Sequence, residues 1–384
     1  MLYYPRRGVR MAKINTSEVR KINKKSILRY LLKNEEATKP QIAIDLKLSI
    51  PTVGLIVDEL VQQGLVENAG VQASSGGRRA AVYRVIKDSV HACGIEISQS
   101  HQIYVIVNIC GEIVASERIS KPFSDDREYI NDVEKYREDF VRRSGVDPQT
   151  VVGAGISVQG LINADQTSFS SHMLDNQRKI MIYPLTDKFP YIYLNDGTAS
   201  CMSECYANQE ERDFVYLMLS RTVGGAIVEN GDIWQGVDSF AGEFGHMCIH
   251  PGDDKVCYCG GKGHAWCYLS SDRLEEICDG PYWNFFTQLE TGDPDCRKFF
   301  ERFLDDLALL VYNVRMMHNS DVVLGGYLGT HLRPYLPDLE KRLQKLDHLY
   351  LESKTKVLIG QYDLEAAGVG AARYFIEQFI VSLS

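Results

Sequence analysis

The chain has no apolar run long enough to cross a membrane. Its longest candidate, from Ile103 to Ile109, is only as long as one strand. The basic residues between Met1 and Arg10 are not followed by an apolar stretch, so they do not form a secretory signal. The 10 cysteines also lack disulfide-like spacing. We therefore expect free thiols and a reducing, cytoplasmic location rather than a membrane or secreted protein.

What the chain does have is a strong charge asymmetry along its 384 residues. The net charge is −9, yet residues 1–87 hold 16 Lys and Arg against 7 Asp and Glu. That balance of +9 leaves −18 for the remaining residues. The length predicts two or three domains. A basic head on an acidic body predicts that only the head contacts a polyanion, and a chance excess of solvated lysines is the competing interpretation.

The pattern of the basic head favours a helix-turn-helix. An amphipathic helix is predicted over residues 23–33. Thr38 and Ser49 are suited to cap the two short helices that follow, and each is followed by a proline within the first turn. The link Lys47-Leu48 is short enough for a tight turn between them. Two capped helices joined in this way are typical of DNA-binding domains.

The second of these helices carries an unusual Gly54. Glycine inside a helix costs about 1 kcal/mol relative to alanine, a cost that close approach to DNA would explain. Two strands, over 65–67 and 81–85, then flank a polar loop with two arginines, which predicts a wing. The competing interpretation is a small helical domain whose wing binds protein or nothing. We expect DNA contacts from Lys39, Gln41, Ser49, Thr52, Arg78 and Arg79.

The segment from Gly242 to Cys267 concentrates metal-ligating side chains. Thiolates and imidazoles at this density fit a tetrahedral zinc site, and the intervening glycines let the backbone wrap around one ion. A structural zinc would stiffen a loop that also carries a candidate ligand-binding carboxylate. The side chains concerned are Glu243, His246, Cys257, Cys259, His264 and Cys267.

After residue 90 the pattern changes to alternating strands and helices. Strands are expected over 92–97, 103–109, 112–116 and 151–158, with a helix over about 127–143. A similar order begins again at a strand over 214–219, which predicts two related α/β lobes with a ligand in the cleft between them. We expect the last helix, over about 363–379, to pack across the first lobe.

Several motifs give the whole chain a resemblance to the ROK family (repressors, open reading frames and kinases), and specifically to its repressor branch. The motifs are the Gly77-Arg78 wing turn, G-A-G-I-S-V-Q-G-L at 153–161, L-N-D at 194–196, G-E-F-G-H at 242–246, C-Y-C-G at 257–260 and L-G-G at 324–326. The resemblance implies an α/β fold: a winged helix-turn-helix followed by a two-lobed actin-like or hexokinase-like (ribonuclease H-like) domain. We expect the head over 12–87 and the ROK domain over 88–384. Its first lobe would hold 88–205 and 363–384, and its second 206–362.

The resemblance also implies a monosaccharide site. Carried over residue by residue, its members are Gly160, Asn195, Asp196, Glu243 and His246. Carboxylates and an amide supply strong acceptors for sugar hydroxyls at fixed angles, so the chemistry agrees. The competing interpretations are that Asn195-Asp196 is only a turn and that Glu243 is only a solvated loop charge.

The family's zinc site has one histidine and three cysteines. His246, Cys257 and Cys259 match it, whereas His264 replaces the third cysteine. Imidazole is an ordinary zinc ligand, so we expect Zn²⁺ on these four residues, with Cys267 as the alternative fourth ligand. A second sugar-binding glutamate of the family is replaced by Trp266, whose indole can stack on a sugar ring but accepts no hydrogen bond.

Both phosphate-binding loops of the family's kinases are altered here. The D-x-G-G-T sequence is replaced by E-I-S-Q-S at 96–100, and L-G-T-G-x-G-G-G by L-S-R-T-V-G-G-A at 219–226. Side chains then crowd the backbone where phosphates would bind. The bulky Tyr327 also follows the Gly325-Gly326 pair. We therefore expect no nucleotide binding and no catalytic residue, with Asp196 acting as a sugar acceptor instead of a base.

The sequence thus predicts a sugar-responsive transcriptional regulator, with a repressor preferred. It would bind operator DNA as a homodimer or tetramer and respond to a monosaccharide or a derivative of one. The alternatives are an ATP-dependent sugar kinase with a regulatory DNA-binding head, and an activator or a regulator that answers to a partner protein.

Overall fold

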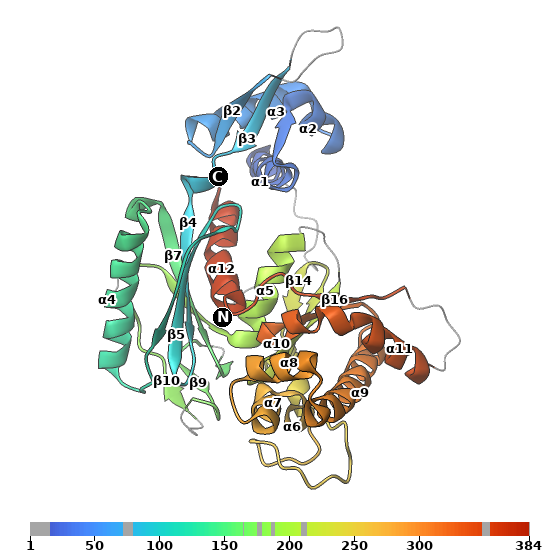
Figure 1. Cartoon of the computed structure of the whole chain (residues 1–384). Coiled ribbons are helices and arrows are strands. Elements are labelled where there is room, and N and C mark those ends of the chain that lie inside the picture. The colour runs from blue at the N-terminus through green and yellow to red at the C-terminus, as the bar shows by residue number, and fades with distance from the viewer. Residues whose placement is uncertain are drawn as a thin grey trace.

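The computed structural model comprises a small head and two larger α/β lobes (Figure 1). It describes residues 16–71, 80–163, 165–174, 179–185, 189–208, 213–347 and 354–383. The wing arginines Arg78 and Arg79 lie outside the described residues. Among the helices within those ranges, none has the length and apolar character needed to cross a bilayer.

The head is a winged helix-turn-helix. Its helices are α1 (Thr16–Asn34), α2 (Lys39–Asp45) and α3 (Ile50–Gln62), and its sheet has the order β1 (Glu36–Thr38), β3 (Ala81–Val85), β2 (Val66–Val71). The predicted caps are confirmed. The Thr38 side chain accepts a hydrogen bond from the Gln41 backbone in a capping box, and Ser49 Oγ accepts one from Thr52 N at 3.3 Å.

Lobe one, as we call the part built on the β4–β11 sheet, has five strands in the order β11-β7-β4-β5-β6. Helix α4 covers one face of this sheet, and α5 and α12 lie on the other (Figure 1). The elements are β4 (His91–Ile97), β5 (His101–Asn108), β6 (Ile113–Ser120), α4 (Arg127–Ser144), β7 (Val151–Val158), β11 (Tyr191–Asn195), α5 (Asp196–Asn208) and α12 (Ala366–Ser382), with the short η1 (Lys87–Ser89), η2 (Pro148–Thr150), β8 (Leu161–Ile162), β9 (Ser168–Ser170) and β10 (Ile180–Met181).

Lobe two, built on the β12–β16 sheet, also has five strands, in the order β14-β13-β12-β15-β16. Its strands are β12 (Phe214–Leu219), β13 (Val223–Glu229), β14 (Asp232–Trp234), β15 (Asp321–Gly325) and β16 (Val357–Ile359). Its helical elements are η3 (Phe244–His246), α6 (Trp266–Leu269), α7 (Ser271–Cys278), α8 (Tyr282–Thr291), α9 (Pro294–Met317), α10 (Gly326–His331), η4 (Arg333–Tyr335) and α11 (Leu336–Leu346).

The two large sheets share one topology. In each, the first strand is central, the second and third add antiparallel on one side, and the fourth and fifth add parallel on the other. This repetition confirms that the body consists of two related α/β lobes. Ligands of such folds bind beyond the carboxyl ends of the parallel strands, which here means the cleft between the lobes.

The C-terminal helix α12 joins lobe one to the head. A Cβ added to Gly94 of β4 would lie 1.8 Å from the carbonyl oxygen of Gly368, so helix and sheet touch through backbone. At its far end, Arg29 Nη2 of α1 donates to Glu377 Oε2 at 2.7 Å. Buried residues of α1 and α12 belong to one hydrophobic cluster, which includes Ile27, Leu28, Leu31, Ile376 and Ile380. The expected packing across the first lobe is therefore confirmed.

Candidate functional site

The carboxyl ends of β7 and β11 bring three of the predicted sugar-binding residues together. The parallel register pairs Asn195 with Val158, which places the turn at Gly160 beside Asn195. Asn195 Nδ2 donates to Gly160 O and to Asp196 Oδ1, both at 3.1 Å, and its Oδ1 accepts from Thr198 N at 3.0 Å. The amide therefore fixes the orientation of the Asp196 carboxyl at the start of α5.

Asp196 is almost buried and faces lobe two. Its Oδ2 accepts a hydrogen bond from Thr222 Oγ1, on the turn before β13, at 3.2 Å. Burial raises the pKa of Asp196 to about 6. The carboxyl is thus shielded from water and held by side chains from both lobes, as a ligand-binding acceptor in a cleft needs to be.

Two further carboxyls, from half-buried residues, share the cleft with Asp196. Burial, followed by the charge of Asp196, raises the pKa of Glu243 to about 7 and that of Glu96 to about 8. Glu243 comes from lobe two, directly before η3, and Glu96 comes from β4 of lobe one. Carboxyl groups on both sides suit a ligand rich in hydroxyl groups, because a carboxyl accepts hydrogen bonds and, when protonated, also donates one.

The predicted metal ligands form one cluster. The donor atoms of His246, Cys257, Cys259 and His264 all lie within 4.8 Å of one another. Cys259 Sγ is 3.3 Å from His264 Nδ1, and Cys257 Sγ is 3.9 Å from His246 Nδ1. Zinc bonds of about 2.3 Å to sulfur and about 2.0 Å to nitrogen separate tetrahedral donors by roughly 3.3–3.8 Å, so the residues fit this ion.

The second ring nitrogen of His246 faces the cleft side of the cluster. His246 Nε2 lies 3.0 Å from the Tyr258 hydroxyl and 3.8 Å from Glu243 Oε2. Cys267 is outside the four-residue cluster, and its thiol donates to the carbonyl of Lys255 at 3.7 Å. One histidine thus has one nitrogen toward the metal ligands and the other toward Glu243.

The Trp266 side chain is buried among other residues of lobe two. Its indole is 9% exposed, packs edge-on against Tyr258 with ring centroids 5.0 Å apart, and donates from Nε1 to the Arg221 carbonyl at 2.9 Å. Stacking on a sugar ring, which the sequence suggested, needs an open ring face that this side chain does not offer. Trp266 instead ties the cysteine-rich loop to the turn between β12 and β13.

The two altered phosphate loops contact each other across the cleft. Arg221 Nη1, on the β12–β13 turn, donates to Gln99 Oε1, on the β4–β5 turn, at 2.8 Å. Gly225 is one of the two glycines that the second loop keeps. Packing alone explains it, because a Cβ there would lie 1.9 Å from the Tyr216 carbonyl oxygen. Side chains therefore span the place where a kinase of this fold would need bare backbone amides.

In the head, the predicted DNA-contacting residues of α2 and α3 differ in whether their side chains already contact other parts of the protein. Lys39 Nζ is paired with Asp58 Oδ1 at 2.5 Å and lies 5.0 Å from the centre of the Tyr83 ring. Gln41 and Ser49 serve as caps, while Thr52 lies at the start of α3. A Cβ added to Gly54 would meet nothing within 4 Å, so the protein itself leaves that position open.

Comparison with known proteins gives two family matches. The model of winged helix-turn-helix DNA-binding domains matches residues 20–67, and the ROK family model matches residues 92–378. The chain belongs to the ROK family.

Relatives of this ROK protein include both regulators and kinases. The xylose repressor of Caldicellulosiruptor bescii is 28% identical over 255 residues, which cover 65% of this chain and 64% of that protein. The crystal structure of a ROK transcriptional regulator, a homologue of the Escherichia coli MLC protein, aligns with a TM-score of 0.73 and 18% identity, over 94% of this chain and 97% of the other. A Streptomyces griseus ROK glucokinase, crystallised with glucose and AMPPNP, aligns with a TM-score of 0.65 and 19% identity, over 74% and 98%.

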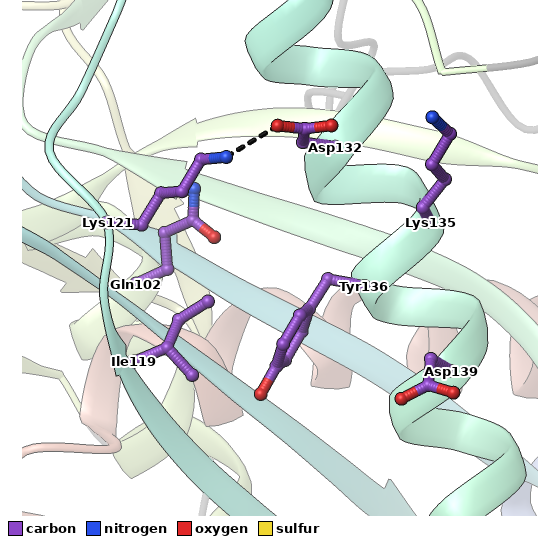
Figure 2. A pocket seen from close by; sticks show the side chains of 7 residues that line it. All are labelled: Gln102, Ile119, Lys121, Asp132, Lys135, Tyr136 and Asp139. Carbon is purple, nitrogen blue, oxygen red and sulfur yellow. Dashed lines mark hydrogen bonds and ion pairs between the residues drawn. The ribbon is translucent and has the colours of Figure 1, made fainter.

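Three features of this ROK protein's cleft escaped the sequence analysis. These are the Tyr258 hydroxyl on His246, the Arg221–Gln99 bridge and the Glu96 carboxyl beside Asp196. Tyr258 lies between two predicted metal ligands, and Arg221 lies within an altered phosphate loop, where it replaces a threonine. The sequence therefore indicated both positions but not the residues that they contact. A separate hollow of about 360 Å³ beside α4 has its Lys121 paired with Asp132 at 2.6 Å (Figure 2), and we assign it no role.

Replacing Gly54 by alanine tests the DNA-facing surface of α3. Because the added methyl group meets no protein atom, the head is expected to gain about 1 kcal/mol of stability from the better helix former. If α3 lies in the groove, the same methyl group weakens operator binding. Thermal unfolding and fluorescence anisotropy on one preparation measure both effects. A more stable variant with unchanged DNA affinity would show that Gly54 does not approach DNA.

Proposed function

We propose that this protein is a sugar-responsive transcriptional repressor. The head binds operator DNA, and a monosaccharide or derivative binds the interlobe cleft through Gly160, Asn195, Asp196, Glu243 and His246. The proposal rests on the combination of a winged helix-turn-helix with a cleft of a particular kind. The cleft keeps the hydrogen-bonding groups expected to bind a sugar, while the Arg221–Gln99 bridge spans the turns that would bind phosphates in a kinase. The likeness to a xylose repressor supports the same role.

The route from the sugar to the DNA runs through α12. This helix begins at the cleft, where Ala366 and Ala367 line the cavity, and reaches the head at Glu377. Head and lobe one are therefore expected to move as one body, while lobe two closes on the sugar. In a homodimer or tetramer, closure changes the spacing of the two heads and so their fit to paired half-sites.

We propose a structural Zn²⁺ on His246, Cys257, Cys259 and His264. The spacing of their donor atoms supports this set, and the position of Cys267 supports His264 as the fourth ligand. The ion would supply rigidity, because it ties the cysteine-rich loop to η3. His246 would then hold its second nitrogen, and the neighbouring Glu243, in place for the sugar.

A sugar kinase is the competing function, since kinases share the fold. The chain does keep an aspartate, Asp196, where a kinase of this family keeps its base. Against that function stands the Arg221–Gln99 bridge, which spans the turns where a triphosphate would bind. We therefore assign no catalytic residue.

The proposal is tested by operator release. DNA that binds the full chain is first selected from genomic fragments and prepared as a fluorescent duplex. Its anisotropy is then followed while xylose, glucose, N-acetylglucosamine, glucose 6-phosphate and N-acetylglucosamine 6-phosphate are added. At least one sugar is expected to lower the operator affinity by about 10-fold or more, a coupling of about 1.4 kcal/mol. Tight operator binding that no saccharide changes would overturn the repressor proposal.

A further inference from the structure

A cavity of about 610 Å³ lies between the lobes, next to the proposed sugar site. Of the five proposed sugar-binding residues, only Asp196 lines it. Its other walls are the two phosphate-loop turns, the start of α8, α10 and the first residues of α12. Small-molecule pockets have volumes of about 300–1,000 Å³, so this cavity is large enough to hold a ligand group beside the monosaccharide.

One wall of this cavity is aromatic. The rings of Tyr282 and Tyr327 lie 4.6 Å apart with an interplanar angle of 30°, and Trp283 beside them is 51% exposed. The Tyr327 hydroxyl is held by Ser271 Oγ at 2.9 Å, which fixes its ring. Aromatic faces are the surfaces against which the apolar faces of sugar rings and of nucleobases stack.

The polar groups on the other walls decide between those two ligands. Carboxyls from Glu96, Asp196, Glu275 and Asp363 line the cavity, and Asp363 Oδ1 is buried with no hydrogen-bond partner among the described residues. These oxygens require hydrogen-bond donors from a ligand. A ligand with many hydroxyl groups supplies them, whereas the ionised phosphates of a nucleotide have no hydrogen to donate.

The cations at the cavity do not reverse this preference. Arg221 is already bound to Gln99 and lies 3.3 Å from Asp272, so only Arg118 remains of the two lining arginines. His101 adds no charge near neutral pH, because burial, followed by the charge of Arg118, lowers its pKa to about 4. The cavity is therefore lined by four carboxyl groups and two guanidinium groups, one of which already has an acidic partner in Asp272.

We propose that this cavity is a second saccharide subsite, so that the effector is a disaccharide or glycoside. One ring binds between Asp196 and Glu243, and the second ring stacks on the aromatic wall while its hydroxyls donate to Asp363 and Glu275. The inference rests on the proposed function, and it specifies the effector of that same site.

The test is isothermal titration of the full chain with matched pairs of sugars, such as xylose and xylobiose or glucose and cellobiose. At least one disaccharide is expected to bind about 10-fold or more tightly than the monosaccharide from which it is built. Trp283→Ala is expected to remove that advantage while leaving the affinity for the monosaccharide unchanged. Trp234→Ala, a tryptophan of equal exposure outside the cavity, is the matched control and should change neither.

The other outcomes each overturn a defined part. If monosaccharides bind and no disaccharide binds more tightly, the subsite is wrong but the proposed function stands. If no saccharide of any length binds, both fail. If adenosine or AMPPNP binds and Trp283→Ala abolishes that binding, the cavity is still a nucleotide site and the subsite is wrong.

Discussion

Replacing Cys259 by serine is expected to release the proposed zinc ion and to destabilise lobe two by about 4 kcal/mol or more. A serine hydroxyl is a poor zinc ligand, and the loss of a structural metal belongs to the most destabilising changes known. Because the cluster joins η3 to the cysteine-rich loop, the variant should also lose its response to sugar. Native mass spectrometry measures the metal, and thermal or denaturant unfolding measures the stability.

Cys248→Ser is the matched control for this change. Cys248 lies in the same segment and is exposed, but it does not belong to the four-residue cluster. The control should keep one zinc ion per chain and its unfolding midpoint. A parent protein that is folded, stable and metal-free would contradict the zinc assignment, as would a Cys259→Ser variant that keeps the ion.

Replacing Glu243 by glutamine is expected to abolish the response to sugar without weakening operator binding. Above the Glu243 pKa of about 7, the change removes a charge-assisted acceptor, which is worth about 1.5–3 kcal/mol, so the sugar affinity should fall by roughly 10- to 100-fold. The head is far from this residue in the chain and packs on α12, so DNA affinity should not change. Calorimetry with sugar and anisotropy with the operator duplex measure the two effects separately.

Glu229→Gln is the control for that variant, because Glu229 is an exposed glutamate at the end of β13 in the same lobe. It should behave as the parent protein in both measurements. Equal losses of sugar and operator binding in Glu243→Gln would show that the coupling through lobe closure and α12 is wrong.

Local chemistry made part of this molecule predictable from its sequence. The caps at Thr38 and Ser49 depend on residues within three positions, and the structure shows the expected hydrogen bonds. The cluster of His246, Cys257, Cys259 and His264 was predicted in the same way, since these four candidate metal ligands lie within one short segment. The repeated strand order, with the motifs at the strand ends, was enough to predict the two lobes.

Contacts between distant parts of the chain were beyond the sequence. Arg221 and Gln99 are 122 positions apart, and Arg29 and Glu377 are 348 apart, so no local pattern links them. The short β1 was missed because three residues carry no periodicity, and α12 begins three residues later than expected. The role of Trp266 was misjudged because its partner, the Arg221 carbonyl, comes from another turn. The proposed domain limits, 12–87 and 88–384, remain predictions.

The central claim is that a sugar alone, without a nucleotide, controls the DNA-binding head. The most direct measurement follows operator anisotropy while the effector sugar is added, with and without Mg²⁺-ATP, and assays the ATP at the end. The account predicts the same release midpoint in both titrations and no ATP consumed. Release that requires ATP, or ATP turnover in step with a phosphorylated sugar, would contradict it.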